Sequence, residues 1–255
     1  MISTVITTYK EPEYLNLCLK SAIEGQSLKN QILVVVDGFY EINKEVLKKY
    51  EKHIDVLSIE ENVGMIRAMN LGHYNSQHDL VFHVQDDNVF PKQWDEKLLK
   101  HYTPNSVLTP NQVEPDESIF RQFHIENLGK NITEFDLNEF WKYEESVRVD
   151  KVDECGSTFP FLIHKIDYLK IGGLDESYPG PWVVDWEFFM KCRFNGLKML
   201  RTYDCNFYHF VSIGTRTPEK IHENRCKEQQ CFEYFKYKWG KYPHTDAVNN
   251  DKSLQ

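Results

Sequence analysis

Two adjacent carboxylates and an amide, Asp86, Asp87 and Asn88, stand just beyond the apolar run Leu80–Val84. Adjacent carboxylates suit a hard divalent cation, and Mg²⁺ or Mn²⁺ bound by them would neutralise a diphosphate. The apolar run has the composition of a buried strand, which would deliver both acids to the edge where open α/β sheets bind ligands. The sequence therefore predicts a metal-dependent nucleotide site. The alternative is a solvated turn, in which Asp and Asn are common.

A third acid ends another predicted strand. Asp37 follows the apolar run Ile32–Val36 and precedes Gly38. Two strands would thus carry acids to one rim of the sheet. Taken alone, Asp37 is the weaker indication, because Asp-Gly after a strand is an ordinary turn signal.

The elements that must position these acids alternate along the chain. Predicted strands are Ile2–Thr8, Gln31–Val36, Val56–Ile59, Leu80–Val84 and Ser106–Thr109. Predicted helices begin near Pro12, Ile42, Gly64 and Pro91. This alternation predicts an α/β fold with a mostly parallel sheet that is covered by helices on both faces.

The regular alternation of strands and helices is lost in the second half of the chain. Asn131–Asp150 is predicted to be an insertion over the rim of the sheet or a lid. A helix over Asp185–Asn195, two short strands over Met199–Tyr203 and Asn206–Phe210, a helix over Pro218–Trp239 and a polar tail over Asp246–Gln255 follow.

Composition limits the function classes. The 255 residues are 41% hydrophobic, and 30 basic against 39 acidic residues give a net charge of −9. This charge disfavours general attraction to nucleic acid or to an anionic membrane. The six cysteines form no CxxC pair, so neither a zinc site nor a disulfide framework is predicted. Without a signal peptide or an apolar run of about 18 residues, a cytoplasmic protein is expected. The basic C-terminal helix leaves peripheral membrane contact open.

The chain lacks the sequence motifs of several enzyme classes. The first strand-to-helix turn, Thr7–Pro12, contains neither GxGxxG nor GxxxxGK[ST], and the chain has no GxSxG or HExxH. These absences favour a phosphate-handling α/β protein that uses a metal in place of a glycine-rich loop. Three hypotheses stay open: a sugar transferase, another metal-dependent nucleotide enzyme, and an inactive module that binds sugar or nucleotide.

Six motifs together resemble the inverting family 2 glycosyltransferases with the GT-A fold, over roughly the first 215 residues. In order, they are Val5–Glu11, Asp37-Gly38, Glu61–Asn70, Gln85–Asn88, Gly172–Glu176 and Asp185–Glu187. The resemblance implies a GT-A (Rossmann-like) domain over residues 1–215, with a donor half of about 1–110 and an acceptor half of about 111–215. Residues 216–255 would add a C-terminal helical extension and the tail.

The resemblance also implies roles on the donor side. Thr8 and Glu11 would line the nucleotide pocket, and Asp37 would meet the base. Asp86 would lie near the ribose, and Arg67 near the nucleotide.

Four further residues receive roles closer to the reaction. Asp87 would hold the metal, Mn²⁺ or Mg²⁺, and Asp185 would be the catalytic base. His209 matches a late histidine that related enzymes place near the diphosphate, although a lone His between aromatic residues is often a packed core residue. Arg216 could bind phosphate, or belong to a solvated charge cluster.

The resemblance implies transfer of one sugar from a nucleoside-diphosphate sugar, with UDP as the expected nucleotide. Because the QxxRW signature of processive synthases is absent, polymerisation is not expected. The acceptor could be a glycan, a lipid-linked saccharide, a protein or a modified DNA base, of which the last is disfavoured by the net charge of −9.

Overall fold

In the computed structural model, the described residues are 1–116, 123–154, 158–211 and 221–243. Arg216 and the predicted tail Asp246–Gln255 lie outside these ranges. The remaining predicted site residues all fall within them.

The strands of the described residues join into one sheet. They are β1 (Ile2–Thr8), β2 (Gln31–Asp37), β3 (Asp55–Ile59), β4 (Leu80–Gln85), β5 (Asn88–Val89), β6 (Ser106–Glu114), β7 (His124–Ile125), β8 (Val152–Glu154), β9 (Phe161–His164) and β10 (Lys198–His209). Their order is β3-β2-β1-β4-β9-β6-β10-β5, with β7 beside β6 and β8 beside β10. The neighbours β3, β2, β1 and β4 are parallel, while β9 runs antiparallel between β4 and β6.

The strands that carry the predicted acids are central. β1 and β2 are buried along their whole lengths, as is the middle of β4. Such strands lie between two helical layers, which explains their nearly continuous apolar sequences. In the register of the sheet, Thr8 pairs with Val36 and Thr7 pairs with Gln85. The ends of β2, β1 and β4 therefore lie side by side.

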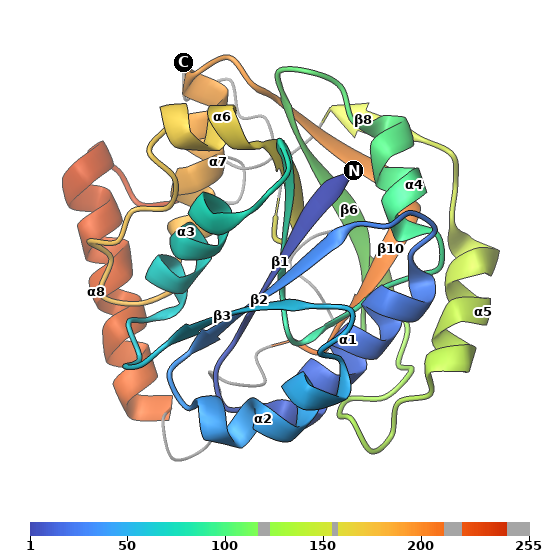
Figure 1. The fold of residues 1–255 in the computed structure, drawn as a ribbon. Coiled ribbons are helices and arrows are strands. Elements are labelled where there is room, and N and C mark those ends of the chain that lie inside the picture. Colours follow the sequence, from blue (N-terminus) through green and yellow to red (C-terminus); the bar gives the residue numbers. More distant parts are fainter. Residues whose placement is uncertain (117–122, 155–157, 212–220, 244–255) are drawn as a thin grey trace.

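Helices cover both faces of the sheet (Figure 1). They are α1 (Pro12–Gly25), α2 (Tyr40–Lys49), α3 (Met65–Asn75), α4 (Trp94–His101), α5 (Leu137–Val147), α6 (Lys165–Lys170), α7 (Val184–Phe194) and α8 (Ile221–Trp239). Core residues of α1, α2 and α4 share one hydrophobic cluster, and those of α3, α6, α7 and α8 share another. None of the described helices combines the length and the apolar character that a membrane span requires.

The architecture confirms the predicted fold class, with differences in several elements. β10 is one strand with a shift of register between Thr202 and Asn206, where two short strands were predicted. β6 continues past Thr109 to Glu114. The segment predicted to be an insertion or lid contains α5, which packs Leu137 and Phe140 against Tyr208 in a cluster at the edge of the sheet.

Candidate functional site

Three of the predicted side chains lie at neighbouring strand ends. Thr8 is the last residue of β1, Asp37 is the last residue of β2, and Asp86 comes directly after β4. The pairing of Thr7 with Gln85 and of Thr8 with Val36 puts all three on one rim. The carboxyl ends of parallel strands thus meet there, as predicted.

Asp86 is held in an environment that disfavours its charge. Burial and the neighbouring charge of Asp87 raise the pKa of Asp86 to about 7, and Glu11 contributes in the same direction. The Thr8 hydroxyl opposes the shift. Because opposite charge would favour the ionised form, this rim is suited to a cationic ligand.

Asp87 lies beside His209, which comes from the distant strand β10. The Nε2 atom of His209 is 3.6 Å from Oδ2 of Asp87, and its Nδ1 atom is 3.0 Å from Oε1 of Glu114. Burial lowers the pKa of His209, but the charges of Asp87 and Glu114 outweigh burial and raise it to about 10. Antiparallel pairing of His209 with Asn88 explains how the two segments meet.

Glu114 is a site residue that the sequence analysis missed. It is buried and is the last residue of β6, as Asp37 is the last residue of β2. An acid at a strand end would have been the signal for Glu114. It was missed because the predicted strand stopped at Thr109, whereas β6 continues to Glu114.

Asp37 holds the loop that leads into α3. Its carboxylate accepts hydrogen bonds from Nδ2 of Asn62 at 2.8 Å and from the backbone N–H of Val63 at 2.7 Å. Burial raises the pKa of Asp37, and the backbone N–H groups of Val63 and Gly64 oppose that shift. Asp37 therefore fixes the entrance of α3 at the rim.

The ion pair found for Arg67 is with Glu176 and not with an acid of the rim. Its Nε atom lies 3.9 Å from Oε2 of Glu176, and its side chain is largely exposed. Both residues come from motifs of the family resemblance, α3 and the turn after α6, which the fold thus brings together.

Asn70 makes the tightest link between these two motifs. Its Nδ2 atom donates to the carbonyl of Leu174 at 2.9 Å and to Glu176 at 2.9 Å, and its Oδ1 atom accepts from the N–H of Leu174 at 3.0 Å. Gly173, with φ of +59°, passes so close that a Cβ there would lie 2.7 Å from Oδ1 of Asn70. The turn therefore needs glycine both for its backbone conformation and for space.

Asp185 occupies the first turn of α7. Burial raises its pKa to about 6, against the opposing effect of the backbone N–H groups of Trp186 and of Asp185 itself. The residue before the helix, Val183, has φ of +58°, which is unusual for a β-branched residue. Strained backbone of this kind clusters at functional sites.

The helix that carries Asp185 is linked through two side chains, Met65 and Phe159, to the strand that precedes Asp86 and Asp87. Nε2 of Gln85 lies 3.1 Å from the sulfur of Met65, and Met65 packs against the cluster that contains Val184. The ring of Phe159 lies 5.6 Å from that of His83 in β4 and 6.1 Å from that of Phe189 in α7. The predicted base and the rim therefore belong to one packed unit.

A second group of possible metal ligands lies elsewhere. His101, Asp150 and Asp204 have ligand atoms within 4.8 Å of one another, and Asp204 precedes His209 by five positions along β10. Nζ of Lys100 lies 2.7 Å from Asp150 and 3.0 Å from Asp204, so a cation already balances these acids. This group differs from the predicted pair Asp87 and His209.

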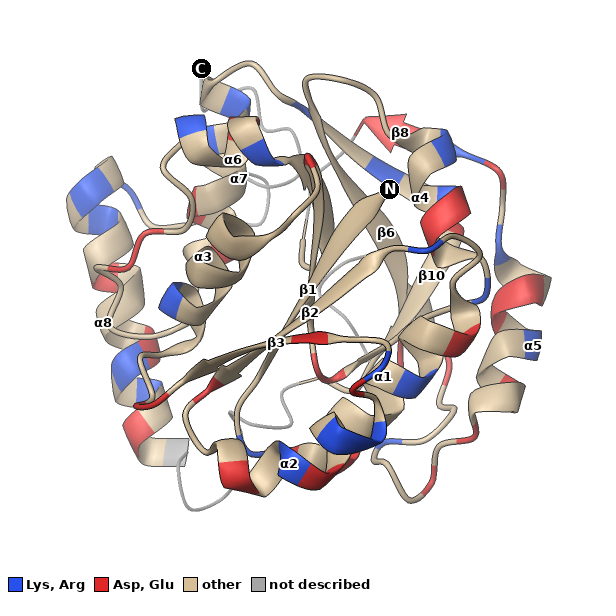
Figure 2. Ribbon diagram, viewed as in Figure 1, with Lys and Arg blue, Asp and Glu red and all other residues tan. Residues whose placement is uncertain are grey.

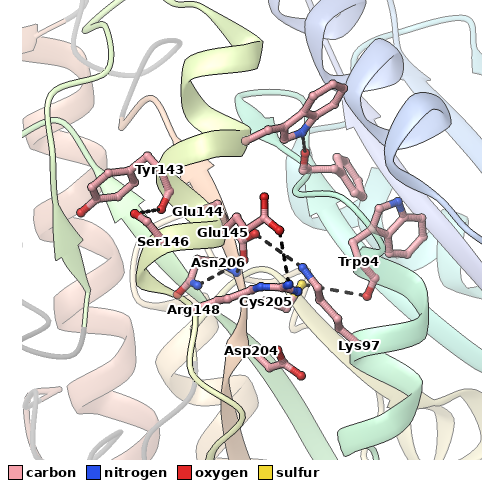
Figure 3. A network of polar contacts seen from close by, with 12 residues as sticks. Trp94, Lys97, Tyr143, Glu144, Glu145, Ser146, Arg148, Asp204, Cys205 and Asn206 are labelled. Carbon is pink, nitrogen blue, oxygen red and sulfur yellow. Dashed lines mark hydrogen bonds and ion pairs between the residues drawn. The ribbon is translucent and has the colours of Figure 1, made fainter.

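The surroundings of this second group hold α4, α5 and β10 together. Nζ of Lys97 lies 3.5 Å from Glu144, and Glu144 accepts hydrogen bonds from Asn206 at the register shift of β10 (Figure 3). Both ends of the ion pair are buried. A cavity of about 600 Å³ opens beside them, lined by Lys97, Lys100, Arg148, Asp150, Asp204 and neighbouring residues.

Comparison with known proteins defines the class. The sequence model of Glycosyl transferase family 2 matches residues 3–159, and the chain belongs to this family of glycosyltransferases. Glycosyltransferase GlyA of Streptococcus pneumoniae serotype 4 is 34% identical over 102 residues, which cover 39% of this chain and 14% of GlyA.

Solved structures agree on the fold. The mannosyltransferase PcManGT from Pyrobaculum calidifontis, in complex with GDP-Man and Mn²⁺, is similar with a TM-score of 0.63 and 12% identity, over 95% of this chain and 65% of that one. GalNAc-T7 with UDP, GalNAc and Mn²⁺ is similar with a TM-score of 0.60 and 17% identity, over 82% of this chain and 43% of that one. The chain spans less than two thirds of each of these three proteins. The fold is that of GT-A glycosyltransferases.

Proposed function

We propose that this glycosyltransferase is metal-dependent and inverting, and that it moves one sugar from a nucleoside-diphosphate sugar, with UDP as the nucleotide, to an acceptor hydroxyl. The observation that carries the proposal is the position of Asp87 beside His209, next to Asp86 on the rim of parallel strand ends. Carboxylates suit Mn²⁺, and imidazole is the commonest metal ligand in proteins.

The residues fit a divalent cation on chemical grounds. Asp87 and Glu114 place negative charge beside His209, Asp86 adjoins Asp87, and burial makes this charge costly. Asp87 and His209 would hold the metal, with His209 in its neutral form, since a ligating imidazole has lost its proton. When bound, the metal would neutralise charge on the leaving diphosphate.

Other residues of the protein would bind the nucleotide part of the donor. Thr8, Glu11 and Asp37 would form the nucleotide pocket at the ends of β1 and β2, and Asp86 would contact the ribose. Arg67 would lie at the margin of that pocket, where its partner is Glu176. The predicted phosphate contact of Arg216 stays a prediction, because Arg216 lies outside the described residues.

Asp185 would take the proton from the acceptor hydroxyl as the sugar is displaced in line. Its burial in the first turn of α7 raises its pKa to about 6, which makes it a better base than an exposed Asp while leaving it ionised near neutral pH. Inversion requires base and leaving group to lie on opposite faces of the sugar.

A donor screen tests the proposal. UDP-, GDP- and dTDP-sugars are added with and without Mn²⁺, and thermal unfolding is followed, because a ligand that binds only the native state stabilises it. We expect a shift with a UDP-sugar that requires Mn²⁺. NMR of the product formed with a hydroxyl acceptor then reports the anomeric configuration, for which we expect inversion. A shift that is independent of metal, or retention at the anomeric carbon, would contradict the proposal.

A further inference from the structure

The helix α8 packs against α7. Cys231 and Phe235 of α8 are buried in the same cluster as Val184 and Phe188 of α7. The last turn of α8 carries Lys236 and Lys238, and Figure 2 shows the basic residues of the helix in blue. One face of α8 is therefore buried against the rest of the protein, whereas the sequence alone allowed the helix to contact a membrane surface or solvent.

Contacts from α8 reach both sides of Asp185. Before it in sequence, Sγ of Cys231 lies 3.5 Å from the carbonyl of Gly180. After it, the ring of Phe232 lies 6.5 Å from that of Trp186. The proposed base is thus flanked by residues that α8 holds.

Lys238 links α8 to two acids at once. Its Nζ atom lies 2.7 Å from Oδ2 of Asp175 and forms a short ion pair with Oε1 of Glu187. Glu187 is 0% exposed and lies two residues after Asp185, in the first turn of α7. A buried carboxylate is costly without a charged partner. In the described part of the chain, the ion pair with Lys238 is the one found for Glu187.

The same ammonium joins α7 to the glycine turn. Asp175 belongs to that turn, where it also accepts a hydrogen bond from Tyr234 of α8 at 3.3 Å. Burial raises the pKa of Asp175, but Lys238 and the hydroxyl and N–H of Ser177 outweigh it and bring the pKa below its usual value. Lys191 of α7 donates to the carbonyl of Gly173 in the same turn. One cation of α8 therefore fixes the turn and the first turn of α7 relative to each other.

We infer that Lys238 is a positioning residue for sugar transfer, which fixes the first turn of α7, and with it Asp185, by pairing with Glu187 and Asp175. This inference rests on the proposed role of Asp185 as base. Lys238 itself touches no reacting atom. Its removal should therefore lower kcat through misplacement of the base and leave binding of the donor at the strand ends intact.

The test compares Lys238→Met with Lys238→Arg and with Lys236→Met, which removes an exposed lysine of the same helix. We expect Lys238→Met to lower kcat about 10- to 100-fold, as misplacement of a reacting group by about 1 Å does, with nearly unchanged KM for the donor. Lys238→Arg should recover most of the loss, and Lys236→Met should behave as wild type. Equal kcat values in Lys238→Met and Lys236→Met would overturn the inference.

Two further measurements separate positioning from folding and from the proposed function. If Lys238→Met fails to fold, the double variant Glu187→Gln/Lys238→Met removes the uncompensated buried charge, and we expect it to fold but to keep the low kcat. Hydrogen exchange of the amides in residues 184–190 should be faster in Lys238→Met than in wild type. If no donor supports transfer in wild type, the proposed function fails, while the exchange rates still decide whether Lys238 holds α7. Faster exchange with an unchanged kcat would also overturn the positioning role.

Discussion

Asp185 and Asp86 are both half-buried acids whose pKa is raised, yet their surroundings differ. Asp86 has the charge of Asp87 beside it, and its pKa rises to about 7. Asp185 lies at a helix N-terminus, where backbone N–H groups favour an anion, and its pKa rises only to about 6. An acid of the second kind can stay ionised at neutral pH without a metal, which suits the proposed base.

Replacement of this base gives the first prediction. Asp185→Asn keeps the shape of the side chain but cannot accept a proton, so we expect kcat to fall about 10²- to 10⁴-fold. Donor affinity should stay near the wild-type value, because the proposed donor pocket lies at the strand ends. Isothermal titration and initial rates measure both quantities. Wild-type turnover in the variant would remove Asp185 from its role.

The pH dependence of the rate gives the second prediction. A general base acts in its ionised form, and burial puts the pKa of Asp185 at about 6. As pH falls below about 6, protonation should lower kcat about tenfold per pH unit. Rates at saturating substrate between pH 5 and 8 measure this limb. A kcat that stays constant down to pH 5 would argue against a base with this pKa.

At the scale of elements, α3 is tied to the turn after α6 through Asn70. The third prediction is that Asn70→Ala lowers the free energy of unfolding by about 2–4 kcal/mol, because several buried hydrogen bonds of the turn lose their partner. Asn75→Ala is the matched control, since Asn75 is exposed at the end of the same helix. Urea unfolding measures the difference. Equal stability of the two variants would show that the turn is held by other contacts.

Patterns along the sequence predicted the elements at the rim, because they depend on local signals. The apolar runs before Asp37 and Asp86 made strands, and their parallel pairing brought the acids together. The bounds of β6 and β10 were less accurate. Pro110 and Asn111 continue β6 because β10 pairs with them, and such pairing with a strand about 90 residues away leaves no local signal.

Two links of the site depend on the whole fold. His209 meets Asp87, and Lys238 meets Asp175, across large separations in sequence. The family resemblance pointed to His209 by position. No motif pointed to Lys238, because the sequence pattern of α8 does not indicate which acid of a distant segment a lysine will face. Glu114 was missed because the predicted strand stopped before it.

Stability of the whole molecule gives the fourth prediction. His83 is fully buried in β4 among His73, Phe159 and Phe161, and burial lowers its pKa to about 3. The unfolded chain takes up the proton near the ordinary pKa of about 6.5, so stability is fully present above that pH and is lost as pH falls toward 3. Between pH 7 and pH 5, the shifted pKa of His83 should lower the free energy of unfolding by about 2 kcal/mol.

His83→Phe checks this prediction, because phenylalanine fills the aromatic surroundings without a titratable group. Urea unfolding at pH 7 and pH 5 should show a smaller loss of stability in the variant, by about 2 kcal/mol. The same loss in variant and wild type would mean that His83 takes up its proton equally in the folded chain.

The central claim is that the acids at the strand ends bind a nucleotide sugar through a divalent cation, and Asp87→Ala tests it most directly. Isothermal titration of the preferred nucleotide sugar is done with and without Mn²⁺ for wild type, Asp87→Ala and Asp150→Asn, which alters the other group of possible ligands. We expect Mn²⁺ to strengthen donor binding in wild type and in Asp150→Asn, and to have no effect in Asp87→Ala. An Mn²⁺ effect that survives in Asp87→Ala, or that is lost in Asp150→Asn, would contradict the claim.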